Sequence, residues 1–178
     1  MDLGVISVRY SRALLKRATE LNMEDKLYEE MQVLARSYLH VPELRFTIDN
    51  PMLAQDKKQM LLETACGTDV TDLTKRFLAL VLKEGRETSL QFMAASYITL
   101  YRQQKNITRG RLITAIPVSP DMENKMKQMV EGRTRGKVEF NTEIDPDIIG
   151  GFILEYDTYR LDASVRTKLN TVLTTLQN

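Results

Sequence analysis

The chain has 178 residues, enough for one large domain or two small ones, and 43% of them are hydrophobic, so it can bury a core. Its 25 Lys and Arg nearly balance its 24 Asp and Glu, which argues against a protein whose affinity comes mainly from neutralising phosphates. The single cysteine, Cys66, and the single histidine, His40, exclude a disulfide framework and a clustered Cys/His metal site. The sequence contains neither a visible secretory signal nor eighteen uninterrupted apolar residues, so we expect a soluble cytoplasmic protein.

Up to about residue 108, apolar residues recur with the period of a helix, and the pattern predicts a bundle of six helices. The first is expected from about Leu3 to Leu21, and Asn22 is expected to cap the second. Pro42 suits the first turn of a short third helix. Asn50-Pro51 then ends it, because the residue before a proline avoids helical geometry.

Similar signals bound the other three helices of this bundle. The fourth is predicted over residues 54–66 and ends at Gly67, and Asp69 is expected to cap the fifth. The segment 88–91 has the pattern of a capping box and is expected to open a sixth helix that reaches about Lys105. The sequence therefore predicts a helical domain over residues 1–108.

From residue 109 the apolar pattern alternates, which predicts a small α+β domain over residues 109–178. Strands are expected from Arg111 to Pro117 and over 137–143, and a strand at 152–156 is expected to lie beside the second of these. Ser119-Pro120 is expected to begin a helix between the first two strands. The fold class is therefore mainly α, a six-helix bundle followed by a small α+β domain.

The end of the chain is expected to form one more helix. A short extended segment at 159–161 leads to Asp162, the expected N-cap of this helix. Its apolar residues recur at helical spacing and are expected to face inward: Val165, Leu169, Val172, Leu173 and Leu176.

Motifs that could carry chemistry are incomplete. The basic turn at 132–137 has three residues between its glycines where a phosphate loop needs four, and it leads into a strand. Gly150-Gly151 lacks the rest of a dinucleotide fingerprint and is better suited to a close backbone approach. His40 and Cys66 have no catalytic partner nearby in the sequence. We therefore expect no catalytic residue, no cofactor, no metal and no bound nucleotide.

Two helices carry more apolar residues than one buried face requires. The first has Val5, Val8 and Leu15 outside its main apolar face, and the fifth has Leu78 and Leu82 outside its own. A second stripe can mean either a central helix or a groove that receives an amphipathic helix from a partner. The methionines at 122, 126 and 129 are open to the same two interpretations, core packing or an adaptable binding surface.

Two segments carry a family resemblance. The stretch from Asp145 to Leu169 resembles the C-terminal signature of the delta subunit of bacterial F-type ATP synthase, the counterpart of the mitochondrial oligomycin-sensitivity-conferring protein. The segment 8–14 resembles the Arg-Tyr-Ala-x-Ala-Leu opening of that family, with Ser11 where alanine is usual. The signature residues, which we expect to be mainly structural, are Asp145, Pro146, Gly150, Gly151, Phe152, Asp162, Ala163 and Ser164.

The resemblance implies a non-catalytic stator subunit, held at the cytoplasmic face of the inner membrane only through the complex. Its helical domain would sit on the catalytic head, where the first and fifth helices hold the N-terminal helical segment of an alpha subunit. Its second domain would bind the C-terminal region of the b-subunit stalk, so that the head resists rotary torque while a proton or sodium gradient drives ATP synthesis. The residues expected to include the alpha-binding groove are Val5, Val8, Tyr10, Leu15, Phe77, Leu78, Val81 and Leu82. Aspartate at Val8 or Leu78 is expected to weaken docking and to leave the domain folded.

Two other interpretations remain open at this point. A small helical RNA-binding factor of the transcription-antitermination type would use a basic face on the first helix, formed by Arg9, Arg12, Lys16 and Arg17. Its affinity would fall steeply with salt, and the near-neutral charge of the chain counts against it. An enzyme with a site between the two domains would need a convergent set of polar residues, which the sequence does not offer.

Overall fold

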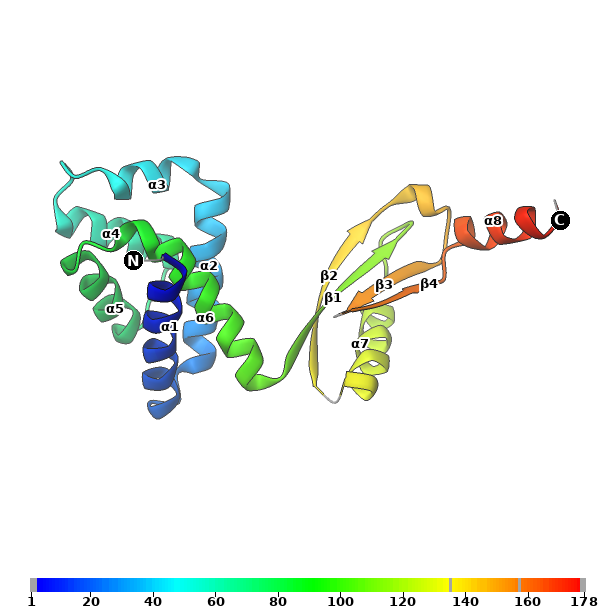
Figure 1. Cartoon of the computed structure of the whole chain (residues 1–178), viewed down its shortest axis with the longest axis horizontal. Coiled ribbons are helices and arrows are strands. Elements are labelled where there is room, and N and C mark those ends of the chain that lie inside the picture. The colour runs from blue at the N-terminus through cyan, green and yellow to red at the C-terminus, as the bar shows by residue number, and fades with distance from the viewer. Residues whose placement is uncertain (1–2, 135, 157, 177–178) are drawn as a thin grey trace. The chain divides into compact units, whose positions relative to one another are not determined.

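The computed structural model describes residues 3–134, 136–156 and 158–176 (Figure 1). They form two compact units, the first ending at Gln103 and the second beginning at Gln104. This division falls slightly before residue 108, where the apolar pattern changes period.

The first unit is helical, as predicted (Figure 1). Its helices, with α6 carrying the chain into the second unit, are α1 (Leu3–Glu20), α2 (Glu24–His40), α3 (Pro42–Asp49), α4 (Gln55–Cys66), α5 (Asp72–Lys83) and α6 (Leu90–Lys105). Pro42 occupies the first turn of α3, and Asn50 is extended before Pro51, so both proline predictions are confirmed. A short 3-10 turn over Glu87–Ser89 precedes α6, where the sequence predicted a capping box.

Two predicted helix caps in the first unit are wrong. Asn22 has a φ of 53° and lies in the turn after α1, and Met23 precedes α2 without a side-chain cap. The cap of α5 is Thr71, whose Oγ1 accepts a hydrogen bond from the backbone N–H of Thr74 at 3.3 Å. Asp69 instead forms an exposed ion pair with Lys26, with 2.9 Å between Oδ2 and Nζ. Sequence spacing alone could not distinguish between two capping residues so close together.

Apolar side chains from all the longer helices fill the core of the first unit. The largest that are fully buried are Leu27, Met31, Leu34, Ile48, Leu62, Leu78, Leu90, Met93 and Tyr97. Ser11, which replaces the alanine usual in the family opening, is also fully buried, and its Oγ donates to the backbone oxygen of Met93 at 2.7 Å. This hydrogen bond connects α1 to α6, so the polar replacement is satisfied inside the core.

The second unit is a four-stranded mixed sheet with two helices, which confirms the predicted α+β class. Its strands are β1 (Ile107–Thr114), β2 (Lys137–Ile144), β3 (Phe152–Tyr156) and β4 (Tyr159–Asp162), and its helices are α7 (Pro120–Thr134) and α8 (Val165–Leu176). The order is β2-β1-β3-β4, with β1 and β2 parallel and the other pairs antiparallel. The prediction that β3 neighbours β2 is therefore wrong, because β1 lies between them. Strand order depends on long-range pairing, which the alternation within each strand does not encode.

The two faces of the sheet differ sharply. One face packs against α7, with Leu112, Val138 and Leu154 buried beneath it (Figure 1). The other face carries a charge ladder, which we define as Glu143, Arg111, Glu155 and Arg160, one residue on each strand in the order of the sheet. Its closest nitrogen–oxygen distances are 2.6, 3.7 and 3.2 Å from one strand to the next. Such partly exposed pairs add little stability. On the same face, Ile113 and Ile153 are buried against Ile148 in a smaller apolar cluster.

The signature residues bring the turn before β3 together with the start of α8. Gly151 has a φ of 73°, and a Cβ there would lie 2.3 Å from the backbone oxygen of Ala163, so a side chain cannot fit. The backbone oxygen of Gly150 accepts from the N–H of Val165 at 2.9 Å. Asp162 was predicted to cap α8, but the Oγ of Ser164 is the group that accepts from the N–H of Thr167, at 3.2 Å. The Asp162 carboxylate instead accepts from the Ser164 N–H at 3.0 Å.

Helix α8 projects its apolar residues into solvent. None of the residues of Val165–Leu176 is buried, and Leu176 is 79% exposed. We define the α8 stripe as its exposed apolar residues, Leu169, Val172, Leu173 and Leu176. The prediction that these residues face inward is therefore wrong, because α8 extends beyond the sheet and contacts mainly the 3-10 turn over Pro146–Ile148.

Candidate functional site

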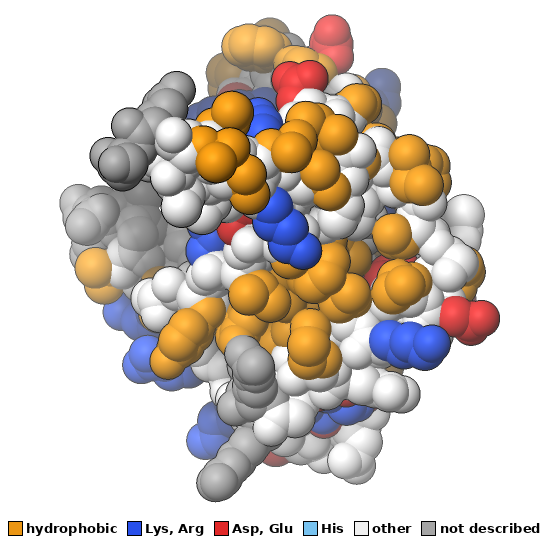
Figure 2. All heavy atoms as spheres, turned by 90° about the vertical axis from the view of Figure 1, so that its right-hand side faces the viewer, with side chains coloured by type: hydrophobic (Ala, Val, Ile, Leu, Met, Phe, Trp, Pro, Cys, Tyr) orange, Lys and Arg blue, Asp and Glu red, His pale blue; other side chains and the backbone are white. Residues whose placement is uncertain are grey.

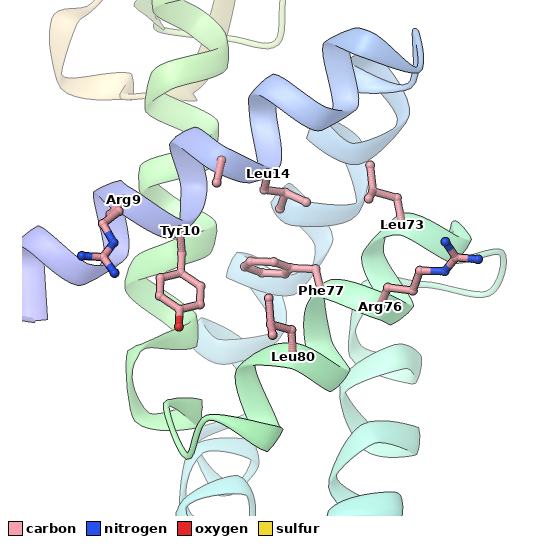
Figure 3. Close-up of a pocket in the computed structure, with 8 residues that line it drawn as sticks. Arg9, Tyr10, Leu14, Leu73, Arg76, Phe77 and Leu80 are labelled. Carbon is pink, nitrogen blue, oxygen red and sulfur yellow. The ribbon is translucent and has the colours of Figure 1, made fainter.

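An apolar groove of about 400 Å³ lies between α1 and α5 of the first unit (Figure 3). Figure 3 shows the rings of Tyr10 and Phe77 pointing into the space between the two helices, with Leu14 and Leu80 beside them. The residues that line the groove are Arg9, Tyr10, Ala13, Leu14, Leu73, Arg76, Phe77 and Leu80.

The floor and the rim of the groove come from different side chains. Leu14 and Phe77 are buried and form the floor, while Leu80 is 49% exposed at the rim. Tyr10 and Leu73 are half-buried between these extremes. An open apolar surface of this kind can take up apolar side chains from a partner without refolding the unit.

A second hollow continues the groove onto the outer face of α1. It shares Arg9 and Ala13 with the groove, and Val5 and Val8 are exposed within it. The other residues that line it are Gly4, Arg12 and Lys16. We call this surface the adjoining hollow.

The residues expected in the groove divide into two sets. Tyr10 and Phe77 line the groove, and Val5 and Val8 lie in the adjoining hollow. The other four, Leu15, Leu78, Val81 and Leu82, are buried in the core of the unit. Because Leu78 is fully buried, the expectation that aspartate there leaves the domain folded is not compatible with its position.

Four apolar residues of the groove were not predicted from the sequence: Leu73 and Leu80 on α5, and Ala13 and Leu14 on α1. A signal was present, because Leu73, Phe77 and Leu80 follow the spacing of one helix face. The competing face holds Thr74, Leu78 and Val81, and it is this face that is buried. The buried face of α5 includes a fully buried threonine, Thr74. Because threonine is common on exposed helix faces, its presence in the sequence does not mark a core face.

A buried carboxylate explains why Thr74 faces the core. Glu30 on α2 is 5% exposed, and it accepts from the backbone N–H of Thr71 at 2.7 Å and from the Thr71 hydroxyl at 3.0 Å. It also accepts a short hydrogen bond from the Thr74 hydroxyl. We call these three residues the Glu30 cluster. The Glu30 cluster holds the first turn of α5 against α2, and in this orientation the opposite face of α5 is turned toward the groove.

A cationic side chain connects the C-terminal end of α5 to α1. The guanidinium of Arg86, which follows α5, lies over the ring of Tyr10 at 5.4 Å from the ring centroid. This contact joins the end of α5 to a groove residue on α1, so the two walls are held together by more than core packing.

Cys66 provides a measure of whether the first unit is folded. It is buried at the end of α4, and burial, followed by the nearby Glu30 carboxylate, raises the pKa of its thiol to about 12. Only the thiolate reacts with alkylating reagents, so we expect iodoacetamide to label the native chain extremely slowly at about pH 8. Labelling should become fast when urea unfolds the unit. Rapid labelling of the native chain would contradict the buried position of this thiol.

His40 is exposed at the end of α2, and the basic turn leads into β2 as predicted, although Arg135 lies outside the described residues. Among residues 3–134, 136–156 and 158–176, no group of three or more His, Cys, Asp and Glu side chains is placed to hold a metal ion. The same ranges contain no helix with the length and apolar character that a bilayer span requires.

Comparison with known proteins gives consistent matches over nearly the whole chain. Residues 6–176 match the family model for the ATP synthase delta (OSCP) subunit. The chain is 50% identical to ATP synthase subunit delta of Phocaeicola vulgatus over 173 residues, which cover 97% of this chain and 94% of that protein. It is 40% identical to ATP synthase subunit delta of Parabacteroides distasonis over 176 residues, with 99% and 98% covered. Its fold is similar to a chain in the cryo-EM structure of the Toxoplasma gondii mitochondrial ATP synthase hexamer, with a TM-score of 0.64, 20% identity and 97% of each chain covered.

The two-unit fold and these matches define a subunit that works as part of a larger enzyme complex and is itself non-catalytic. The chain belongs to the ATP synthase delta (OSCP) subunit family.

Proposed function

We propose that this chain is the stator link of an F-type ATP synthase, in which the first unit binds the catalytic head and the second unit binds the peripheral stalk. The observation that carries the proposal is the open apolar groove between α1 and α5. The complex uses a proton or sodium gradient to make ATP, and this subunit is held at the cytoplasmic face of the membrane only through its partners.

The proposed occupant of the groove is the N-terminal helical segment of an alpha subunit. An amphipathic helix docks in such a groove by placing apolar side chains from successive turns between the two walls. Leu73, Phe77 and Leu80 from α5 face Tyr10 and Leu14 from α1, so each wall offers several apolar side chains. The geometry therefore suits a single helix, which satisfies its own backbone hydrogen bonds and needs only apolar contacts from the two walls.

The proposed contact with the b subunits is the α8 stripe. Its residues are spaced by three or four positions, which is the spacing of the seam between two packed helices. Figure 2, which views the molecule from the side on which α8 lies, shows hydrophobic side chains gathered at the surface. The C-terminal region of the b-subunit stalk would cover this stripe with an apolar face of its own.

The function follows from holding both partners at once. Rotation of the central shaft applies torque to the head, and a link between head and stalk keeps the head still. Each contact can have moderate affinity, because binding at one site raises the effective concentration at the other.

The test separates the two contacts by mutation. In the double variant Val172→Asp and Leu173→Asp, we expect the b subunits to be lost when the complex is isolated from native membranes, while the alpha subunit still binds. Both residues are more than half exposed, so the unfolding midpoint should stay close to that of the wild type.

The matched control carries the same added charge on the opposite face of α8, as Thr171→Asp and Thr174→Asp. This control should keep both partners. Retention of the b subunits by the Val172/Leu173 variant would overturn the proposed stalk contact, and failure of the wild-type chain to retain an alpha subunit would overturn the head contact.

A further inference from the structure

Positive charge is concentrated around the groove. Arg9 on α1 and Arg76 on α5 border the groove itself, one from each wall. Figure 3 shows their guanidinium groups pointing away from the apolar floor on opposite sides. Arg12 and Lys16 extend this charge through the adjoining hollow, and among the described residues no carboxylate lines either surface.

These cations differ from several others in the same unit. Lys26, Lys58 and Arg17 each have a carboxylate within 2.9 Å. Arg9, Arg12, Lys16 and Arg76, by contrast, make no ion pair within the part of the chain that the structure describes. Arg9, Arg12 and Lys16 also repel one another, because positions three and four apart lie on one face of a helix. The groove is therefore bordered by cations that no carboxylate among the described residues neutralises.

We infer that the groove selects an amphipathic helix with carboxylates on both sides of its apolar stripe, and that Arg9 and Arg76 are the residues that determine this specificity. The inference rests on the proposed function, since it specifies the chemistry of the segment that the groove accepts. A helix seated on the apolar floor would direct its flanking side chains toward the two walls. A carboxylate on one flank would then meet Arg9, and a carboxylate on the other flank would meet Arg76.

The apolar floor alone would not provide this selectivity. Leu14 and Phe77 can accept apolar side chains from many amphipathic helices, because burial of apolar surface is not directional. Charges at the rim of an interface mainly set the rate of association and exclude partners that carry the same sign. The floor therefore provides the contact area, and Arg9 and Arg76 select the partner by its charge.

The inference is tested with the full-length chain and three labelled helical peptides that share one apolar stripe. Their flanking positions carry glutamate, glutamine or lysine. We expect the glutamate peptide to bind about tenfold more tightly than the glutamine peptide at low salt, and the lysine peptide to bind most weakly. The preference should shrink between about 50 and 500 mM NaCl, because salt screens exposed charges.

Charge reversal identifies the residues responsible. The double variant Arg9→Glu and Arg76→Glu should lose the preference for the glutamate peptide and favour the lysine peptide. The matched control, Arg36→Glu and Lys57→Glu, makes the same change in net charge at exposed positions on α2 and α4 and should bind as the wild type does. Slow labelling of Cys66 confirms that each variant is folded.

The outcomes distinguish this inference from the proposed function. If the wild-type chain binds all three peptides equally and charge reversal changes nothing, the inference is overturned while docking in the groove stands. If no peptide binds, and an alpha-subunit N-terminal segment does not bind either, the proposed function loses its head contact. If the four cations bind single-stranded RNA, with no preference among the peptides, the inference is overturned in favour of a nucleic-acid surface.

Discussion

The Leu80→Asp variant is expected to stay folded and to lose binding of an alpha-subunit N-terminal peptide by at least about a hundredfold, whereas Leu78→Asp is expected to unfold the helical unit. The two residues lie two positions apart on α5 and point to different surroundings. Leu80 is half-exposed at the rim of the groove, while Leu78 is fully buried. A carboxylate in the groove would remain hydrated when free but would oppose an apolar partner. At Leu78 the loss of a core leucine alone costs about 2–5 kcal/mol, and burying an unpaired charge adds to that.

Two measurements check this pair of variants. Fluorescence anisotropy of the labelled peptide reports docking, and urea unfolding followed by circular dichroism reports the fold. Wild-type peptide affinity in Leu80→Asp would show that the groove is not the docking site. A wild-type unfolding midpoint in Leu78→Asp would show that this side chain is not part of the core.

The Glu30→Ala variant is expected to lower the free energy of unfolding by about 3 kcal/mol. Replacing a glutamate on a helix usually has a small effect, but this carboxylate is buried. The substitution leaves the backbone N–H of Thr71 and the hydroxyls of Thr71 and Thr74 without their buried acceptor. It also releases the first turn of α5 from α2, so we expect weaker peptide binding in the groove even where the unit remains folded.

The control for this variant lies next to it in the sequence. Glu29→Ala removes the same charge from an exposed position on α2 and should change the free energy of unfolding by less than about 0.5 kcal/mol. Equal unfolding midpoints for the two variants would contradict the structural role of the Glu30 cluster. Glu30→Gln, which keeps one acceptor oxygen, should fall between the other two.

Local signals in the sequence predicted the helices of the first unit well. Pro42 and Asn50-Pro51 bound α3, and α4 stops before Gly67, where the sequence placed its end. These features depend on the backbone preferences of single residues, which act wherever the residue stands. The caps of α2 and α5 were less predictable, since Asn22, Asp69 and Thr71 are all suitable capping residues. At α5 the cap is Thr71, which is held by Glu30 of the distant α2, whereas α2 has no side-chain cap.

The sequence also revealed that α1 and α5 carry surplus apolar residues, but not which of their faces would remain open. Thr74 is fully buried, and its hydroxyl donates a hydrogen bond to the buried carboxylate of Glu30. In this orientation of α5, Leu78 faces the core and Leu80 faces the groove. The same limit applies to α8. An amphipathic pattern indicates that the apolar face of a helix packs against something, but it does not say whether that surface belongs to the same chain. Leu169 and Leu173 were therefore expected to face the core of the second unit, although both are exposed.

The place of β1 in the sheet has a mechanical consequence. β1 begins directly after α6 and has β2 on one side and β3 on the other, and all eight of its residues are in register with β2. Tension along the chain at this junction would enter the sheet through an inner strand. Hydrogen bonds run across the strands, so the pull would shear many of them together and would not open them one after another, as at a frayed end. In the proposed stator role, the covalent connection between the two units thus reaches the sheet where repeated loading is shared among neighbouring strands.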